Sequence, residues 1–398
     1  MNHNSNKNPT SQKLRGVKVF VGMSGGVDSS VSALLLKQAG YDVIGVFIKV
    51  WQPDFIECTW REDRLDAMRV AAQLDIPFVT LDLEKEYKEE VIDYMIEEYR
   101  NGRTPNPDVC CNRFVKFGGF LNWARKQGGI VATGHYAQVI AKNYSPDVVA
   151  GPDEKTRRTN MYDSSSHFPA PSHENNFLQS QYSLVKGIDN NKDQTYFLWT
   201  LTQDDLKDIL FPVGGFEKPE VRNIAEKNNI YTSNKKDSQG LCFVGTIDIK
   251  TLLKEYIKEE KGNVLNEEGK VIGSHEGVTF YTIGERHGFV ITEKGIDDKP
   301  YFIVKKNLEK NELIVSHQKP EEKNTKVFEI EKVNLDYIDF NKIYDARARY
   351  RAPLAKVKIR KEGNKYLVEK IEGQLVAISG QSLVLYDGDV CIGGGIIV

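Results

Sequence analysis

The chain has 398 residues, of which 40% are hydrophobic and 28% charged, so it is long enough for two or three domains with buried cores. No stretch approaches the roughly 18 apolar residues of a membrane-spanning helix, and the polar N-terminus lacks the apolar run of a signal peptide. We therefore expect a cytoplasmic protein that has no membrane partner. The 54 Lys and Arg residues nearly balance the 56 Asp and Glu residues, which excludes a nucleic-acid binder that depends on bulk charge alone.

The first part of the chain alternates short apolar runs with helical patterns. The apolar runs cover residues 18–22, 43–50, 78–83 and 129–133, and the helical patterns cover residues 29–38, 61–74, 84–100 and 112–127. This alternation predicts an α/β fold with a doubly wound parallel sheet, which binds its ligand at the carboxyl ends of the strands.

Residues 143–181 interrupt this pattern, because they are rich in Ser, Pro, Asn and Asp, and we expect a flexible insertion there. Helical patterns return at residues 197–210, 218–228 and 248–259. Strand patterns follow at residues 277–282, 300–304, 355–360, 374–378 and 382–386. The last of these runs predict a small C-terminal β-barrel. We expect a disordered tail at 1–15, the main α/β domain at 16–245, a small central domain at 246–298 and the barrel domain at 299–398.

A glycine-rich loop, Gly-Met-Ser-Gly-Gly-Val-Asp-Ser, occupies residues 22–29 between a predicted strand and a predicted helix. Its glycines let backbone amides approach an anion, its serines add hydroxyl donors, and the helix directs its positive dipole at the bound group. No Gly-Lys-Ser/Thr ends the loop, so it is not a Walker A motif, and Asp28 is expected to help hold a Mg²⁺ ion that bridges phosphates. We predict a pyrophosphate cradle in preference to a plain turn capped by Asp28. Its residues are Gly22, Met23, Ser24, Gly25, Gly26, Val27, Asp28 and Ser29.

Gly134 and His135 follow the last predicted strand of the sheet, where the parallel-sheet rule expects ligand contacts. A glycine there permits close approach to a nucleotide. For His135 a hydrogen-bonded histidine at a strand end is the alternative to a role in the site.

The loop resembles the PP-loop of the ATP pyrophosphatases, whose fold is similar to that of the adenine nucleotide alpha hydrolases. These enzymes split ATP between its α- and β-phosphates and transfer AMP to an oxygen. The resemblance implies ATP and Mg²⁺ as cofactors and makes residues 16–245 the catalytic domain. Because some members use ammonia or amines as the nucleophile, the loop alone does not determine the reaction.

The five cysteines include no pair with zinc-site spacing, so we predict no structural metal, and their number indicates reduced thiols. Cys111 follows a proline-stiffened loop and begins a predicted helix, whose N-terminus lowers a thiol pKa below its free value of about 8.5. Asp108 lies three residues earlier and is a candidate acid or base. A buried structural cysteine is the alternative for Cys111. Cys242, in a glycine-flanked polar loop, would be unconvincing by itself.

Further motifs stand in the order typical of the tRNA-specific 2-thiouridylase family, which the chain resembles over residues 16–398 outside the insertion. They are PNPDVCCN at 105–112, ATGHYA at 132–137, KDQTYFL at 192–198, DSQGLCF at 237–243, a glycine-histidine motif at 269–277 and YTIGER at 281–286. The resemblance implies adenylation of the C2 oxygen of the wobble uridine, followed by sulfur transfer from a cysteine persulfide. The products would be 2-thiouridine, AMP and pyrophosphate.

The resemblance also assigns roles to single residues. Cys242 would accept the persulfide from a carrier protein or cysteine desulfurase relay, and Cys111 would be its nucleophilic partner, the two ending as a disulfide or releasing sulfide locally. Ile48 would contact adenine, at a position where the family usually has methionine. Residues Asn106, Pro107 and Asp108 would meet the target base. We expect contacts with the anticodon arm of tRNA from His135, Lys192, Asp193, Gln194, Arg349, Tyr350 and Gln381.

We expect a monomer, and two alternatives to the sulfurtransferase remain open. One is an amide-forming PP-loop ligase of the argininosuccinate or asparagine synthetase type, which would not need Cys242. The other is a non-catalytic RNA-binding protein with a decayed nucleotide site, against which the intact residues 24–29 argue.

Overall fold

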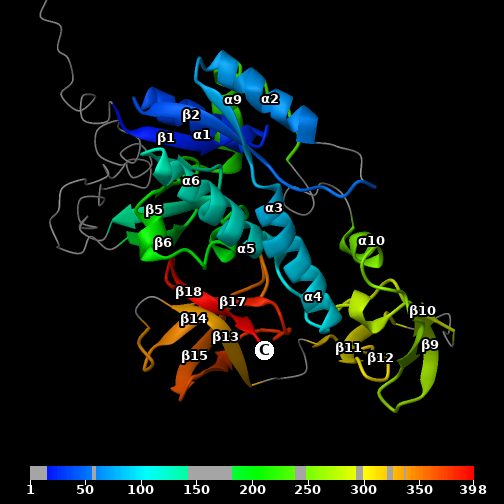
Figure 1. The fold of residues 1–398 in the computed structure, drawn as a ribbon. Helices are drawn as coiled ribbons and strands as arrows, with labels where there is room; N and C mark the ends of the chain where they lie inside the picture. The colour runs from blue at the N-terminus through cyan, green and yellow to red at the C-terminus, as the bar shows by residue number, and fades with distance from the viewer. Residues whose placement is uncertain are drawn as a thin grey trace, which may run out of the picture. The chain divides into compact units, whose positions relative to one another are not determined.

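A computed structural model describes residues 16–55, 60–141, 182–237, 248–292, 299–320, 326–335 and 338–398. The expected tail, the expected insertion and the candidate Cys242 lie outside these residues. The chain divides into two compact units, whose elements are labelled in Figure 1. Unit 1 comprises Met1–Lys88, Cys111–Gln239 and Asp389–Cys391, and unit 2 comprises Glu89–Cys110, Gly240–Gly388 and Ile392–Val398.

Unit 1 is built on a parallel sheet of five strands in the order β3-β2-β1-β4-β7. The strands are β1 (Lys18–Gly22), β2 (Asp42–Lys49), β3 (Phe78–Asp82), β4 (Ile130–Ala132) and β7 (Ile209–Leu210). The expected α/β fold with a parallel sheet is confirmed. β7 pairs with β4 at the edge of the sheet, within the stretch that we predicted to be helical.

Helices cover both faces of this sheet. Val19 and Val21 of β1 belong to the same core as the helices α1 (Val27–Gln38) and α2 (Trp60–Gln73). Phe20, between those two valines, points to the other face, where its ring lies 4.9 Å from that of Trp123 in α6 (Leu121–Lys126). Since successive side chains of a strand point to opposite faces, α1 and α6 lie on opposite sides of the sheet.

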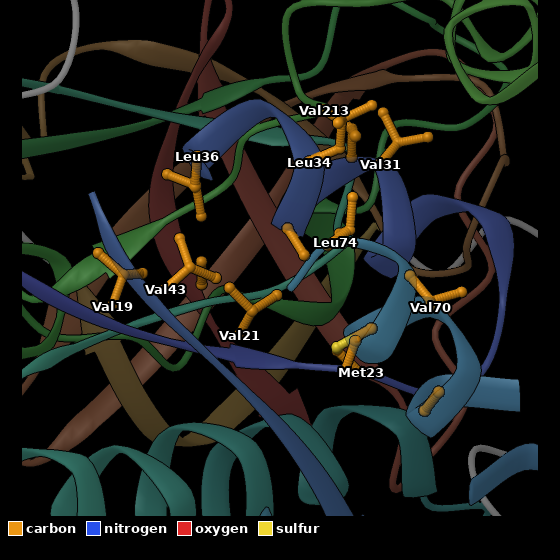
Figure 2. Close-up of a cluster of buried hydrophobic side chains, with 14 of the residues drawn as sticks. Val19, Val21, Met23, Val31, Leu34, Leu36, Val43, Val70, Leu74 and Val213 are labelled. Carbon is orange, nitrogen blue, oxygen red and sulfur yellow. The ribbon is translucent and has the colours of Figure 1, made fainter. Parts of the chain in front are cut away.

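The main core of unit 1 fills the space between the sheet and α1 and α2 (Figure 2). Leu36 of α1 lies beside Val19 and Val43, whereas Val31 and Leu34 lie beside Val213. Val70 of α2 and Leu74, which directly follows this helix, also belong to the cluster. Helix α9 (Lys218–Lys227) packs against α1 and adds Val221 and Ala225.

Unit 1 also contains an antiparallel pair, β5 (Ala137–Ala141) and β6 (Tyr182–Lys186). Val390 and Cys391 pair with β6, which is why these late residues belong to unit 1.

The helical pattern expected at 84–100 forms three consecutive segments, α3 (Glu84–Tyr87), η2 (Lys88–Asp93) and α4 (Tyr94–Arg100). Further on, α5 (Pro107–Cys110) leads into η3 (Cys111–Phe120) and α6. The segments η2 and η3 have the wider turns of a π-helix, which is rare and often found at functional sites.

Within unit 2, the central part combines α10 (Ile249–Lys254) with a sheet in the order β10-β9-β8-β12-β11. Its strands are β8 (Gly262–Leu265), β9 (Val271–His275), β10 (Val290–Ile291), β11 (Phe302–Asn307) and β12 (Glu312–Ser316). β12 pairs in parallel with β8, so β11 and β12 belong to this sheet although they lie beyond residue 298, where we expected the central domain to end. The strand predicted at 277–282 is a short 3-10 helix, η6 (Val278–Phe280).

The C-terminal part of unit 2 is a closed barrel of six strands, orange to red in Figure 1. Its strands are β13 (Val327–Leu335), β14 (Ile343–Arg347), β15 (Ala355–Glu362), β16 (Lys365–Glu372), β17 (Ser382–Asp387) and β18 (Val390–Ile397). They follow the order β13-β16-β15-β14-β17-β18, and pairing of β13 with β18 closes the ring. The expected barrel is confirmed, although residues 374–378 do not form the predicted strand. No helix in the described parts of the chain has both the length and the apolar character to cross a membrane.

The prediction of a single helix at 197–210 is wrong. This stretch instead contains η5 (Thr195–Phe197), the one-turn helix α8 (Gln203–Leu206) and strand β7. Thr202 interrupts the pattern because its side chain accepts a hydrogen bond from the Asp205 amide and starts a new helix with a capping box.

Substitution Leu36→Ala should lower the free energy of unfolding by about 2–5 kcal/mol, because it removes methyl groups from a fully buried position and leaves a cavity. Urea denaturation followed by tryptophan fluorescence measures this loss. The matched control is Leu65→Ala on α2, a leucine that is 45% exposed, whose effect should stay within about 0.5 kcal/mol. Equal losses in the two variants would contradict the proposed core.

Candidate functional site

The predicted phosphate loop connects β1 to the N-terminus of α1. Gly25 has φ +75°, and a Cβ atom there would lie 2.3 Å from the carbonyl oxygen of Asp63, so only glycine fits without strain. Gly26 is the N-cap of α1, and no side chain caps this helix end. The alternative in which Asp28 caps the helix is therefore not what the structure contains, and the first amides of α1 are left for another acceptor.

The two loop serines are brought together. The Ser29 hydroxyl accepts a hydrogen bond from the Ser24 amide (3.2 Å), lies 3.3 Å from the Ser24 hydroxyl and donates to the Gly26 carbonyl (3.2 Å). Ser24 is exposed, whereas the side chains of Met23 and Val27 are buried in the core. Met23 and Val27 can therefore meet a ligand only through their backbone. The same holds for the predicted adenine contact Ile48, which is 5% exposed.

Gly134 lies against the first turn of α1. A Cβ atom at this position would lie 2.7 Å from the Ser29 amide nitrogen, so the glycine permits the loop after β4 to touch the helix start. We predicted that this glycine permits a nucleotide to come close. In the structure it permits close contact with the phosphate loop itself.

Asp28 is the charged residue of the loop, and donors already surround it. Both carboxylate oxygens accept hydrogen bonds from Lys218 Nζ, at 2.7 and 2.9 Å, and Oδ1 also accepts one from the Tyr136 hydroxyl at 2.8 Å. Burial and the neighbouring Asp28 charge raise the pKa of Tyr136 above its ordinary value, so the phenol stays protonated and remains a donor.

A second carboxylate, Asp237, joins this group. Its oxygens lie 2.6 Å from Lys192 Nζ, 2.7 Å from Arg222 Nη2 and 2.9 Å from Lys218 Nζ. Burial opposes ionisation of Asp237, but hydrogen bonds from Lys192 and Lys218 outweigh it and hold the pKa well below its usual range. Asp237 directly precedes the undescribed stretch 238–247, which includes Cys242.

Sequence reasoning missed Tyr136, Lys218 and Asp237 as partners of the loop. Lys218 lies 190 positions from Asp28, so no local pattern could connect them. One signal existed: Lys218 follows β7, and residues after a strand of a parallel sheet gather at its ligand-binding edge. That signal was lost because β7 was predicted to be helical.

Three predicted RNA contacts from residues 192–194 make intramolecular bonds in this structure. Lys192 pairs with Asp237, as described above. Asp193 is 2% exposed, and its carboxylate accepts bonds from Thr195 and from the Gly187 amide. Gln194 accepts a bond from the Tyr136 amide (2.9 Å), and its own amide donates to the Tyr136 carbonyl (2.9 Å). Gln194 therefore supports the position of Tyr136, and the contact of all three residues with RNA stays a prediction.

His135 is buried and neutral. Its Nε2 atom lies 3.4 Å from Lys116 Nζ, and its Nδ1 atom lies 2.6 Å from the Thr133 hydroxyl. Burial and the positive charge of Lys116 lower the pKa of His135 well below 6.5. A neutral imidazole cannot bind phosphate as a cation, so any RNA contact by this residue would need another interaction.

Cys111 is the first residue of η3, and its side chain is 0% exposed. The preceding helix α5 begins at Pro107, and the side-chain oxygen of Asn106 just before it accepts bonds from the amides of Asp108 (3.2 Å) and Val109 (3.3 Å). The predicted base-contact residue Asn106 thus caps this helix in the described state. Asp108 is half-buried and lies three positions before Cys111.

The remaining predicted RNA contacts lie in unit 2. Gln381 donates through Nε2 to the carbonyl oxygens of Thr104 (2.7 Å) and Pro105 (3.3 Å), so it lies next to the predicted base-contact segment 106–108. Arg349 donates to the Ile283 carbonyl (3.1 Å), and Tyr350 follows it in the chain after β14.

A glycine-rich loop between the first strand and the first helix of a parallel sheet is typical of nucleotide-binding α/β domains, among which are those of the PP-loop class. Three family models match consecutive parts of this chain. They are the tRNA methyl transferase HUP domain at residues 17–246, the tRNA methyl transferase PRC-barrel domain at 250–317 and the aminomethyltransferase beta-barrel domain at 330–397.

Curated relatives cover nearly the whole chain. The tRNA-specific 2-thiouridylase MnmA of Streptococcus thermophilus (strain CNRZ 1066) is 43% identical over 96% of this chain and 95% of its own length. The protein of the same name from Listeria welshimeri is 42% identical over 96% of this chain and 94% of its own. The structure of the U34-tRNA thiolase NcsA from Methanococcus maripaludis is 17% identical, covers 62% of this chain and 70% of that one, and has a TM-score of 0.31, which is too low to inform the fold. The chain belongs to the tRNA-specific 2-thiouridylase MnmA family.

Because the folded state keeps His135 neutral, the unfolded chain, in which a histidine has a pKa of about 6.5, binds more protons at acid pH. The free energy of unfolding should therefore fall as the pH drops below about 6.5, by up to about 1.4 kcal/mol per pH unit from this residue. Urea denaturation between pH 5 and 8 measures the slope. His135→Gln should reduce the slope, and an unchanged slope would exclude His135 as its source.

Proposed function

We propose that this protein makes 2-thiouridine in tRNA by adenylating the C2 oxygen of the wobble uridine and replacing it with sulfur. The observation that supports this most directly is the phosphate loop at the N-terminus of α1, in a chain that matches 2-thiouridylases over 96% of its length. The substrate is tRNA, bound through its anticodon arm. A persulfide carrier or cysteine desulfurase relay supplies the sulfur, and the enzyme acts as a cytoplasmic monomer.

The first step makes the uridine oxygen a leaving group. A uridine C2 carbonyl is a poor electrophile, and attack of its oxygen on the α-phosphorus of ATP converts it into an adenylate while pyrophosphate leaves. The amides of Gly25, Gly26 and the first turn of α1, with the hydroxyls of Ser24 and Ser29, are the donors for these phosphates.

The second step transfers sulfur. The outer sulfur of a persulfide on Cys242 attacks C2, and AMP leaves with the former oxygen. The Cys111 thiolate then attacks the Cys242 sulfur, which breaks the sulfur–sulfur bond, leaves the outer sulfur on the uridine and forms a Cys111–Cys242 disulfide. An external thiol reduces this disulfide before the next turnover. Asp108 is the candidate to accept the proton of the Cys111 thiol.

Cys111 is 0% exposed, so the second step requires a local rearrangement that opens the start of η3 to the substrate. The helix before it, α5, has only four residues, and its N-terminal amides depend on the Asn106 side chain. Because so short a helix has little stability of its own, α5 is the part of the segment that can unfold at the lowest cost in free energy.

In the proposed reaction Mg²⁺ binds together with the nucleotide, through its phosphates. The expectation that Asp28 holds it does not fit the structure, because both oxygens of Asp28 accept bonds from Lys218 and one also from Tyr136. No group of three or more His, Cys, Asp or Glu side chains in the described ranges could hold a metal ion.

The proposed function is tested by incubating the protein with tRNA, ATP, Mg²⁺ and a sulfide or persulfide source, and analysing the tRNA nucleosides by mass spectrometry. The wobble uridine should gain the mass difference between sulfur and oxygen, and AMP and pyrophosphate should form only when tRNA is present. Formation of AMP without thiolated tRNA, when an amine acceptor is supplied, would instead support the amide-forming ligase.

Cys111→Ser and Cys242→Ser should each reduce thiolation by more than about 100-fold, because each removes a sulfur that takes part in the transfer. Pyrophosphate release with tRNA should persist in both variants, since adenylation precedes sulfur transfer. Cys391→Ala is the control for Cys111→Ser, because each removes a buried cysteine, and it should keep wild-type thiolation. Normal thiolation by either serine variant would refute the proposed sulfur relay.

A further inference from the structure

Lys218 is the first residue of α9, yet its side chain reaches the phosphate loop. The side chain is 10% exposed, and its ammonium nitrogen lies within 2.9 Å of three carboxylate oxygens, two from Asp28 and one from Asp237. Burying an ammonium group removes its hydration, which costs free energy unless nearby partners compensate. Here the carboxylates compensate for this loss and fix the position of the ammonium group.

We propose that Lys218 is the phosphate-binding lysine of this site, and that Asp28 positions it instead of holding a metal ion. The lysine would contact the β-phosphate of ATP and the pyrophosphate that leaves. The proposal rests on the proposed function, because it concerns the same nucleotide site. The loop at residues 22–29 contains no lysine of its own, so the charge has to come from elsewhere in the chain.

Lys218 is fixed both at its backbone and at its ammonium group. Its backbone amide donates to Asp189 Oδ2 (3.0 Å), and a capping box between Glu217 and Glu220 fixes the start of α9. At the other end, the Tyr136 hydroxyl holds the carboxylate of Asp28 (2.8 Å). A charge fixed in this way need not reorganise when negative charge develops near it.

The cations around the loop offset the charge of its carboxylates. Asp28 alone would repel the phosphates of a nucleotide bound at the loop. Three cations, Lys192, Lys218 and Arg222, pair with the carboxylates Asp28 and Asp237, and the carboxylate of Asp189 lies at the Lys218 amide. The three positive charges therefore offset the three negative ones, beside a loop whose amides favour anions.

The chemistry needs such a charge at this place. When the uridine oxygen bonds to the α-phosphorus, the bond from that phosphorus to the bridging oxygen breaks, and its electron pair stays on pyrophosphate. An ammonium group beside the β-phosphate stabilises this developing charge without giving up its proton.

The test is titration of inorganic pyrophosphate into the full-length protein, with EDTA present to remove divalent cations, followed by calorimetry. Lys218→Met should weaken binding by at least about tenfold, and Lys218→Arg should recover part of the loss. Lys186→Met is the matched control, because Lys186 is also a lysine with a nearly buried side chain (13% exposed) that pairs with an aspartate, Asp389. It should bind pyrophosphate like the wild type.

A double variant separates direct contact from simple neutralisation of Asp28. If Lys218 contacts phosphate, Lys218→Met combined with Asp28→Asn should stay as weak as Lys218→Met alone. Recovery of wild-type affinity in the double variant would overturn the proposal, as would unchanged affinity in Lys218→Met. Melting temperatures establish that each variant is folded.

If Lys218→Met does not fold, Lys218→Arg provides the test, because it keeps the charge of the ion pairs. It should change kcat and KM for ATP at an unchanged melting temperature, whereas unchanged kinetics would overturn the proposal. A different result would contradict the proposed function: the absence of pyrophosphate release by the wild-type protein with ATP and tRNA. Wild-type turnover without measurable pyrophosphate binding in EDTA would overturn only the role of Lys218.

Discussion

The packing of the first turn of α1 is the constraint on which the nucleotide site depends. Two glycines make it possible: a Cβ atom at Gly25 would lie 2.3 Å from the Asp63 carbonyl, and one at Gly134 would lie 2.7 Å from the Ser29 amide. The phosphate loop is therefore enclosed by α2 and by the loop after β4 as well as by its own strand and helix. Its amides are already ordered before a ligand arrives, so binding an anion costs little conformational entropy.

The same packing determines the charges around the loop. Asp28 lies in the first turn of α1, where the helix dipole favours a carboxylate, and Lys218 neutralises it from the first turn of α9. Because Lys218 also pairs with Asp237, the phosphate loop, α9 and the start of the segment toward Cys242 share one set of ion pairs. Breaking one of these pairs would leave a charge without its partner, so the three segments stabilise one another.

Sequence reasoning succeeded where the signal is local. The strand at 18–22, the glycine loop and the helix after it are contiguous, and their periodicity and composition predicted this part of the fold correctly, while anion binding by the loop stays a prediction. It failed at 197–210, where buried apolar residues are mixed with exposed polar ones, because such a pattern does not distinguish one helix from several short segments. Thr202 divides that stretch, and with β7 misassigned, the approach of Lys218 to the loop could not be foreseen. Neither could the burial of Cys111, because exposure depends on packing between distant parts of the chain.

The burial of Cys111 is compatible with the nucleophilic role proposed for it. A thiol activated by a helix N-terminus is nucleophilic, and an exposed thiol of that kind is readily oxidised or alkylated. In the described state this sulfur is inaccessible to solvent. The element that would have to yield is α5, four residues capped by one asparagine through bonds of 3.2 and 3.3 Å. A base that binds at Asn106 would compete for that cap, so occupation of the site by the substrate and release of the thiol would follow from the same contact.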